Sequence, residues 1–174
     1  MVNWVTNLIG RIIETLRAIV APLVPTIDLE TGICRFEINY WKSRWRMITA
    51  GRYHDVDKDC MAMRCFPVSG VGRVRVEGKL FHFNRNLKSD EVEREFDKAG
   101  YRSANIAELL AFGATFPNVQ RDFPVIGLGS TSWISGDDVV PCLDVDRGRR
   151  TFGERWWSHN WNARVRFLAV RKAA

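Results

Sequence analysis

Three histidines and four cysteines are the side chains of this sequence best suited to catalysis or metal binding. A catalytic site needs a nucleophile, a base and a group that orients them. His54, His82 and His159 are far apart in the chain, and neither a Gly-x-Ser-x-Gly turn nor a phosphate-binding loop accompanies them. We therefore expect no enzyme. We expect His82, inside the apolar run 80–83, to be a core residue and His159 to lie at the surface.

The cysteines and the first acidic run do not have metal-site spacing. Cys34, Cys60, Cys65 and Cys142 lack the paired spacing of a zinc site, so we expect reduced, mostly buried thiols, no metal and no cofactor. The run Asp55, Asp57, Asp59 resembles the opening of a calcium loop. However, Cys60 stands where that loop needs glycine, and Phe66 stands where it needs glutamate. We expect a solvated turn there.

The last third of the chain, residues 133–172, concentrates four tryptophans and many arginines. Aromatic and arginine side chains most often anchor binding. We expect a short apolar strand at residues 139–143. Because we otherwise find no regular helical or strand periodicity between residues 136 and 164, we interpret this run as loops that form a ligand-binding surface. We expect Trp133 and Trp157 to be exposed, and Trp156 and Trp161 to anchor the loops in the core.

Small polar side chains between these tryptophans would make an adaptable surface for a protein ligand. The candidate ligand-binding residues are Thr131, Ser132, Trp133, Ser135, Asp137, Asp144, Arg147, Arg149, Trp157, Ser158, His159, Asn160, Asn162 and Arg164. An alternative for the charged members is mutual salt bridging that shapes the loops. It would join Asp137, Asp138, Asp144 and Asp146 to Arg147, Arg149, Arg150 and Arg155.

The net charge of +6 permits attraction to nucleic acid, which is the alternative partner. The basic residues are interleaved with acidic ones, and no nucleic-acid-binding motif is present. The chain has 174 residues, which suits one domain with a sizeable core. Since we find no signal peptide and no apolar run long enough for a membrane span, we expect a cytoplasmic protein.

Residues 3–21 have the pattern of an amphipathic helix, which Pro22 and Pro25 would end. The apolar stripe offers residues for self-association, namely Val5, Leu8, Ile9, Ile12, Leu16 and Ile19. Packing on its own domain and interfacial membrane anchoring are the alternatives for this helix. We expect residues 1–26 to serve oligomerisation or docking, and residues 27–174 to form the ligand-binding domain. A self-assembling structural protein is a further alternative function.

The framework of the second segment is expected to be α+β. Residues 34–40 alternate apolar and polar side chains, as in a half-buried strand. Ser89 would cap a helix that ends at Gly100, and Asn105 with Glu108 predicts a capping box for a second helix. The apolar run VRFLAV, residues 165–170, is expected in the middle of a sheet.

This order resembles the C-type-lectin fold, in which the first and last strands pair and the loops between them carry the site. The segment GYRSANIAELLAFG is similar to the opening of the second helix in formylglycine-generating-enzyme-like members. The segment RWWSHNWNARVRFLAV resembles their closing Trp-rich loop and final strand. The resemblance implies two short helices, a small antiparallel sheet and long loops. It covers roughly residues 74–172.

The pattern LFHFNR…SDEV…GYR…ELLAFG…LGS…RFLAVRK also resembles a family of small bacterial proteins. It is similar to the variable proteins of diversity-generating retroelements, which display a diversified binding face on this fold. The resemblance implies a diversified surface between residues 130 and 164. Only Cys142 remains where the oxidase members carry a cysteine pair, and only Trp161, Asn162 and Ala163 keep part of a sugar-binding signature. We therefore expect neither oxidase chemistry nor calcium-dependent sugar binding.

Overall fold

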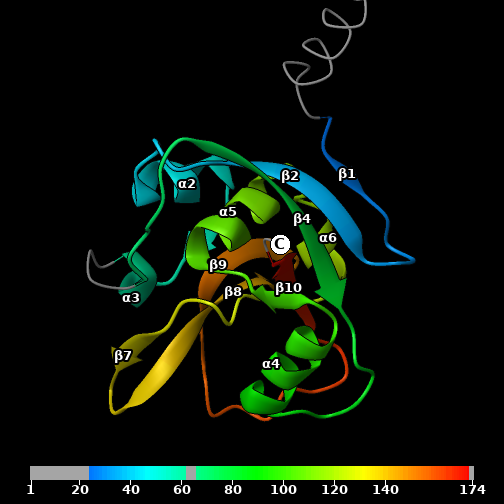
Figure 1. Cartoon of the computed structure of the whole chain (residues 1–174). Coiled ribbons are helices and arrows are strands. Elements are labelled where there is room, and N and C mark those ends of the chain that lie inside the picture. Colours follow the sequence, from blue (N-terminus) through cyan, green and yellow to red (C-terminus); the bar gives the residue numbers. More distant parts are fainter. Residues whose placement is uncertain (1–23, 62–65, 173–174) are drawn as a thin grey trace, which may run out of the picture.

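A computed structural model describes residues 24–61 and 66–172 of the chain. Within these residues the fold is α+β, with ten strands joined in one sheet and five short helices (Figure 1). The strands are β1 (Thr26–Ile27), β2 (Ile33–Asn39), β3 (Asp55–Val56), β4 (Arg73–Phe81), β5 (Tyr101–Ser103), β6 (Val125–Ile126), β7 (Ser132–Ile134), β8 (Asp137–Asp146), β9 (Arg149–Trp156) and β10 (Arg166–Arg171). The helices are α2 (Arg44–Ala50), α3 (Lys58–Met61), α4 (Ser89–Lys98), α5 (Ile106–Thr115) and α6 (Val119–Asp122).

The sheet has the strand order β1-β2-β4-β10-β6-β8-β9-β3, with β5 paired to β10 and β7 paired to β8. The last strand, β10, lies between β4 and β6, which confirms its predicted place inside the sheet. The sheet is larger than the small antiparallel one expected, and it is mixed, since β6·β10 and β3·β9 are parallel pairs. Helix α5 contacts both β2 and β8, so the sheet bends around this helix.

Two elements predicted from short sequence patterns, the strand β2 and the start of helix α5, are confirmed. In β2, Cys34, Phe36 and Ile38 are buried while Arg35 faces solvent, which confirms the half-buried strand. Asn105 caps α5 by accepting from the backbone N–H of Glu108, whose carboxylate accepts in return from the N–H of Asn105. This is the predicted capping box.

Helix α4 also ends where it was predicted to end. Gly100 follows the helix with a φ of +78°, a left-handed conformation that glycine adopts without strain. The predicted cap at the other end was displaced by one residue. Ser89 lies inside the helix, and its hydroxyl donates to the carbonyl oxygen of Trp157 at 2.6 Å.

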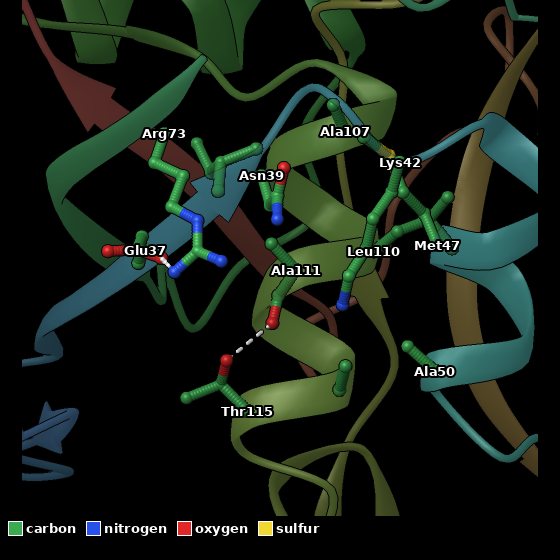
Figure 2. A pocket seen from close by; sticks show the side chains of 12 residues that line it. Glu37, Asn39, Lys42, Met47, Ala50, Arg73, Ala107, Leu110, Ala111 and Thr115 are labelled. Atoms are coloured by element: carbon green, nitrogen blue, oxygen red, sulfur yellow. Dashed lines mark hydrogen bonds and ion pairs between the residues drawn. The ribbon is translucent and has the colours of Figure 1, made fainter.

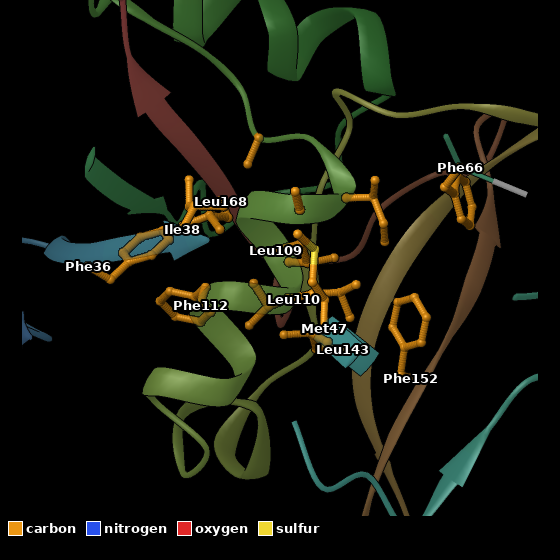
Figure 3. Close-up of a cluster of buried hydrophobic side chains, with 14 of the residues drawn as sticks. Phe36, Ile38, Met47, Phe66, Leu109, Leu110, Phe112, Leu143, Phe152 and Leu168 are labelled. Carbon is orange, nitrogen blue, oxygen red and sulfur yellow. The ribbon is translucent and has the colours of Figure 1, made fainter. Parts of the chain in front are cut away.

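Two hydrophobic clusters fill the two sides of the sheet. The first surrounds α5 and includes Phe36, Phe112 and Leu143 (Figure 3). The second lies beside α4 and includes Phe96, Phe167 and the indole of Trp161. Strand β8 contributes to both, because Val139 and Leu143 belong to the first cluster while Val140 and Cys142 belong to the second. The predicted burial of Trp161 is confirmed.

Arg150 is a buried cation that joins β9 to three helices, α2, α5 and α6. Its guanidinium donates to the carbonyl oxygens of Gly51 at 2.7 Å and Gly113 at 2.8 Å, and to the side-chain oxygen of Gln120 at 2.9 Å. Burial lowers its pKa. Among the described residues no carboxylate forms an ion pair with it, so the salt bridge considered for Arg150 is wrong. Of the acidic and basic groups in this part of the chain that the structure describes, Arg155 and Asp144 form one ion pair, at 2.6 Å.

The structure also bears on the predicted thiols and histidines. Cys34, Cys60 and Cys142 are free and buried, as expected, and burial raises the pKa of Cys34 and Cys142 to about 12. His82 is exposed rather than part of the core, and its Nε2 lies 2.8 Å from the carbonyl oxygen of Ala163. His159 is exposed, as predicted.

Two sequence predictions concern long segments. The amphipathic segment 3–21, with its proposed self-association residues, lies outside the described residues. The strand expected at residues 139–143 is confirmed as part of β8. The loops expected over the rest of residues 136–164 are wrong for most of their length, because β8 and β9 form a regular hairpin there. None of the helices described here is long and apolar enough to cross a lipid bilayer.

Candidate functional site

Two tryptophans remain exposed where β7 joins the β8–β9 hairpin, at the end of the hairpin away from its turn. Trp133 of β7 is 71% exposed, and Trp156 of β9 is 43% exposed. In the strand register Ser132, Val139 and Trp156 form one row, and Trp133 lies opposite Asp138 in the next. Because neighbouring rows point to opposite faces of a sheet, the two indoles lie on opposite faces of this end.

A pocket of about 270 Å³ lies on the face that carries Trp156. Ile134, Val139 and the indole of Trp156 supply its apolar part, and Asp59 and Glu154 bring carboxylates. Asp59 comes from the short helix α3, which lies close to β9. We call this end of the sheet the β7 tip and define it by Trp133, Ile134, Ser135, Glu154 and Trp156, together with Asp59.

The carboxylates give the pocket a negative character. Oxygen atoms of Asp57, Asp59 and Glu154 lie within 4.8 Å of one another. The pKa of Glu154 is raised, chiefly by burial and further by the negative charges of Asp57 and Asp59; a hydrogen bond from the Cys60 thiol, at 2.7 Å, opposes the rise. Arg155 also lines the pocket, and its guanidinium pairs with Asp144 at 2.6 Å. The pocket is therefore suited to a cationic group.

These three carboxylates are also the group of potential metal ligands that the described part of the chain brings together. Hard cations such as Ca²⁺ prefer oxygen ligands of this kind. Asp57 and Asp59 are exposed, and exposed acidic groups commonly occur without a bound ion. The D-x-D-x-D run is exposed, as expected, but it is not a turn, because Asp55 pairs in β3 and Asp59 lies in α3.

The loop that follows β9 carries several predicted ligand-binding residues and is fastened to the β7 tip. The hydroxyl of Ser158 donates to the carboxylate of Asp137 at 2.5 Å, and the N–H of Trp157 donates to the carbonyl oxygen of Asp138. Trp157 is partly buried against the second hydrophobic cluster. The predictions that Trp157 is exposed and that Trp156 anchors the loops in the core are therefore wrong, because Trp156 is the more exposed of the two. Four further candidates are exposed, namely Thr131, Asn160, Asn162 and Arg164.

The predicted arginines lie at the other end of the hairpin. Arg147 occupies the β8–β9 turn, and Arg149 follows it, with a guanidinium nitrogen 2.5 Å from Nε2 of His54. Strand β8 has ten residues, so it separates this turn from the β7 tip by about 30 Å. The predicted residues therefore do not form one continuous surface. Ser132, Trp133, Ser135, Asp137 and Ser158 gather at the tip, whereas Arg147 and Arg149 do not.

Asp59, Ile134, Glu154 and Trp156 were missing from the predicted site. The alternation of side chains along β9 places Glu154 and Trp156 on one face, a signal present in the sequence. The approach of α3 depends on the β3·β9 pair, and Cys60 and Glu154 are 94 positions apart in the chain. No short motif reports a contact of that range.

Comparison with known proteins found no match: no protein family, no curated protein and no solved structure is similar to this chain.

Proposed function

We propose that the β7 tip is a non-enzymatic binding site for a protein ligand, and that its pocket receives a lysine or arginine side chain. The observation that carries this proposal is the partly exposed Trp156 beside a pocket with the carboxylates of Asp59 and Glu154. A cation can contact the face of an indole and pair with a carboxylate at the same time. Trp133, on the other face of the tip, supplies further rigid contact area.

We also propose that residues from β4 onward adopt a C-type-lectin-like arrangement. Supporting this, β4 and the last strand, β10, pair antiparallel, and α4 and α5 follow β4 with the three-residue strand β5 between them. In this proposal the diversified positions are those with exposed side chains, such as Trp133, Ser135 and Asn160. Sequencing of independent gene copies tests it. We expect variation at these positions and an unchanged β10.

Assembly through residues 3–21 remains part of the proposed function, on the basis of the apolar stripe in their sequence. An oligomer would then present several copies of the β7 tip, and a ligand with several binding sites would bind it more tightly than a single copy does. Light scattering on the full chain and on a variant lacking residues 1–25 tests this step. We expect a defined oligomer and a folded monomer, respectively. Two monomers would contradict it.

The binding site is tested by selecting a displayed library of random peptides against the full chain. We expect selected peptides to be enriched in lysine or arginine. We also expect them to lose about tenfold or more in affinity for a Trp156→Ala variant, since such anchors contribute upward of 1.4 kcal/mol. Arg149→Ala, at the far end of the hairpin, is the matched control and is expected to bind unchanged. Selected peptides that bind the Trp156→Ala and control variants equally would overturn the proposal.

A further inference from the structure

Helix α2 and the residues before it form a second exposed aromatic surface, and this one is basic. Between residues 38 and 54 the chain has four cations, Lys42, Arg44, Arg46 and Arg52, and no carboxylate. Trp41 is 73% exposed and Trp45 is 54% exposed. Two neighbouring solvated indoles are not needed to hold the fold together. We call Trp41, Lys42, Trp45, Arg46 and Arg73 the α2 surface.

Local structure explains why these side chains point outward. The Ser43 side chain caps α2 by accepting from the N–H of Arg46. Met47 and Ile48 turn into the first hydrophobic cluster, whereas Trp45, Arg46, Thr49 and Ala50 are exposed. The apolar side of α2 is therefore already used by the core.

A cleft of about 240 Å³ separates the end of β2 from α5 (Figure 2). Small side chains of α5, including Ala107 and Ala111, form one wall. Figure 2 shows the Lys42 side chain extending along α5, with its amino group directed into the cleft. The guanidinium of Arg73 borders the cleft on the other side, 3.6 Å from the carboxylate of Glu37. The cleft is thus lined by two cations, Lys42 and Arg73, and by one carboxylate, that of Glu37.

A wider cleft of about 520 Å³ lies on the other side of residues 40–43. Tyr40, Trp45 and Phe66 are among its lining residues, so its wall is rich in aromatic side chains. Lys42 lines both clefts. The wider cleft, whose aromatic wall suits planar rings, and the smaller cleft, which offers hydrogen-bond donors, therefore share Lys42.

We propose that the α2 surface binds single-stranded nucleic acid, with a phosphate held by Lys42 and Arg73 and a base stacked on Trp45. Proteins that bind single strands combine a cationic groove along the backbone with aromatic platforms for the bases. The charge of this segment and the net charge of +6 both complement a polyanion. This site is separate from the one proposed at the β7 tip, and neither depends on the other.

An anionic membrane is the competing partner for a basic, aromatic surface. Membrane-surface helices insert a continuous apolar face into the bilayer. Helix α2 has seven residues, and its apolar side chains Met47 and Ile48 are buried. Two concave clefts also match a chain with protruding phosphates and bases better than a flat lipid surface. These features favour nucleic acid.

Fluorescence anisotropy of the full chain with a labelled single-stranded DNA of mixed sequence, about ten nucleotides long, tests the proposal. We expect Trp45→Ala to weaken binding about tenfold, because stacking of one base contributes on that scale. We expect Lys42→Gln to weaken binding and to lower the salt slope by about one unit of log affinity per log salt. Trp133→Ala, at the β7 tip, is the matched control and is expected to bind like the wild type.

Each alternative outcome of this experiment is decisive. Absence of binding at low salt, or equal binding by the Trp45→Ala and Trp133→Ala variants, would overturn the proposal. Binding to vesicles that contain about a third anionic lipid, without binding to the oligonucleotide, would assign the surface to a membrane. Equal thermal midpoints for all three variants, expected because the changed side chains are exposed, show that a loss of binding is not a loss of folding.

Discussion

The β7 tip and the α2 surface each expose two tryptophans, yet their charges are opposite. At the tip, Asp59 and Glu154 border the pocket beside Trp156. At the α2 surface, Lys42 and Arg46 accompany Trp45, and no acidic residue occurs between residues 38 and 54. Exposed aromatic rings mark a contact surface of either kind. The surrounding charge determines whether a cationic side chain or a phosphate chain fits it.

The two surfaces also differ in how the chain assembles them. Most of the α2 surface comes from consecutive residues, and only Arg73 is brought in by the β2·β4 pair. The pocket of the β7 tip joins α3 to strands that follow it by more than 70 positions, as the separation of Asp59 and Ile134 shows. A net charge of +6 averages the two surfaces and conceals the acidic one. Local charge must therefore be read from the folded chain.

The largest expected effect concerns Arg150, which stabilises the framework that carries both regions. It lies on the strand that ends in the β7 tip and donates to Gly51, at the end of α2. Replacement by alanine leaves the acceptors on Gly51, Gly113 and Gln120 without their donor. At about 1 kcal/mol for each lost bond, we expect Arg150→Ala to lower the free energy of unfolding by about 3 kcal/mol. Urea denaturation followed by tryptophan fluorescence measures this change.

The neighbouring Arg149 provides the control, because its guanidinium is exposed and contacts the exposed His54. We expect Arg149→Ala to change the free energy of unfolding by less than about 0.5 kcal/mol. If the two variants unfold at the same urea concentration, the buried hydrogen bonds of Arg150 do not stabilise the framework. A loss of stability confined to Arg150→Ala would show that they do.

The sequence predicted local elements better than long-range ones, for identifiable reasons. The Asn105–Glu108 capping box and the Gly100 helix end depend on residues a few positions apart, and both were confirmed. The apolar run 139–143 predicted part of β8, but β9 was missed because the cation Arg150 occupies one of its buried positions and interrupts the apolar alternation of a half-buried strand. The acidic pocket was missed because it depends on β3 pairing with β9.

The difference in ligand preference between the β7 tip and the α2 surface is tested by replacing one tryptophan of each surface by alanine, in separate variants. We expect Trp156→Ala to weaken the selected cationic peptides about tenfold or more and to leave oligonucleotide binding unchanged. Trp45→Ala is expected to do the reverse. Isothermal titration of both ligands against both variants gives the four affinities. A variant that weakens both ligands equally would mean that the two surfaces are not independent.

A smaller expected effect is a difference between the two surfaces in how strongly salt weakens ligand binding. If two or three phosphates are neutralised, a fourfold rise in salt lowers the affinity of the oligonucleotide about tenfold. A single cationic side chain in the pocket of the β7 tip is shielded in part by Trp156, so we expect its affinity to fall less than about threefold. Anisotropy titrations at matched salt concentrations measure both slopes. Equal slopes would show that the two surfaces do not differ in how charge contributes to binding.

The smallest expected effect is a pH dependence that belongs to the β7 tip alone. The folded chain holds the pKa of Glu154 above its usual value, so between the two values the folded state binds more protons than the unfolded state. The stability contributed by the protonated carboxyl is therefore lost as pH rises through this window. Affinity for a cationic peptide moves in the opposite direction, because the carboxyl becomes charged.

Thermal unfolding and peptide binding measured across this pH window test both trends on one protein. We expect Glu154→Gln to flatten both, since a glutamine side chain does not ionise. Glu95→Gln is a suitable control, because the hydrogen-bonded ion pair with Lys98 lowers the pKa of the partly exposed Glu95, whose contribution to stability appears as pH rises. If Glu154→Gln keeps the wild-type pH dependence of peptide affinity, the pocket does not receive the cation. If it loses that dependence while oligonucleotide binding is unchanged, the acidic character of the tip determines its ligand.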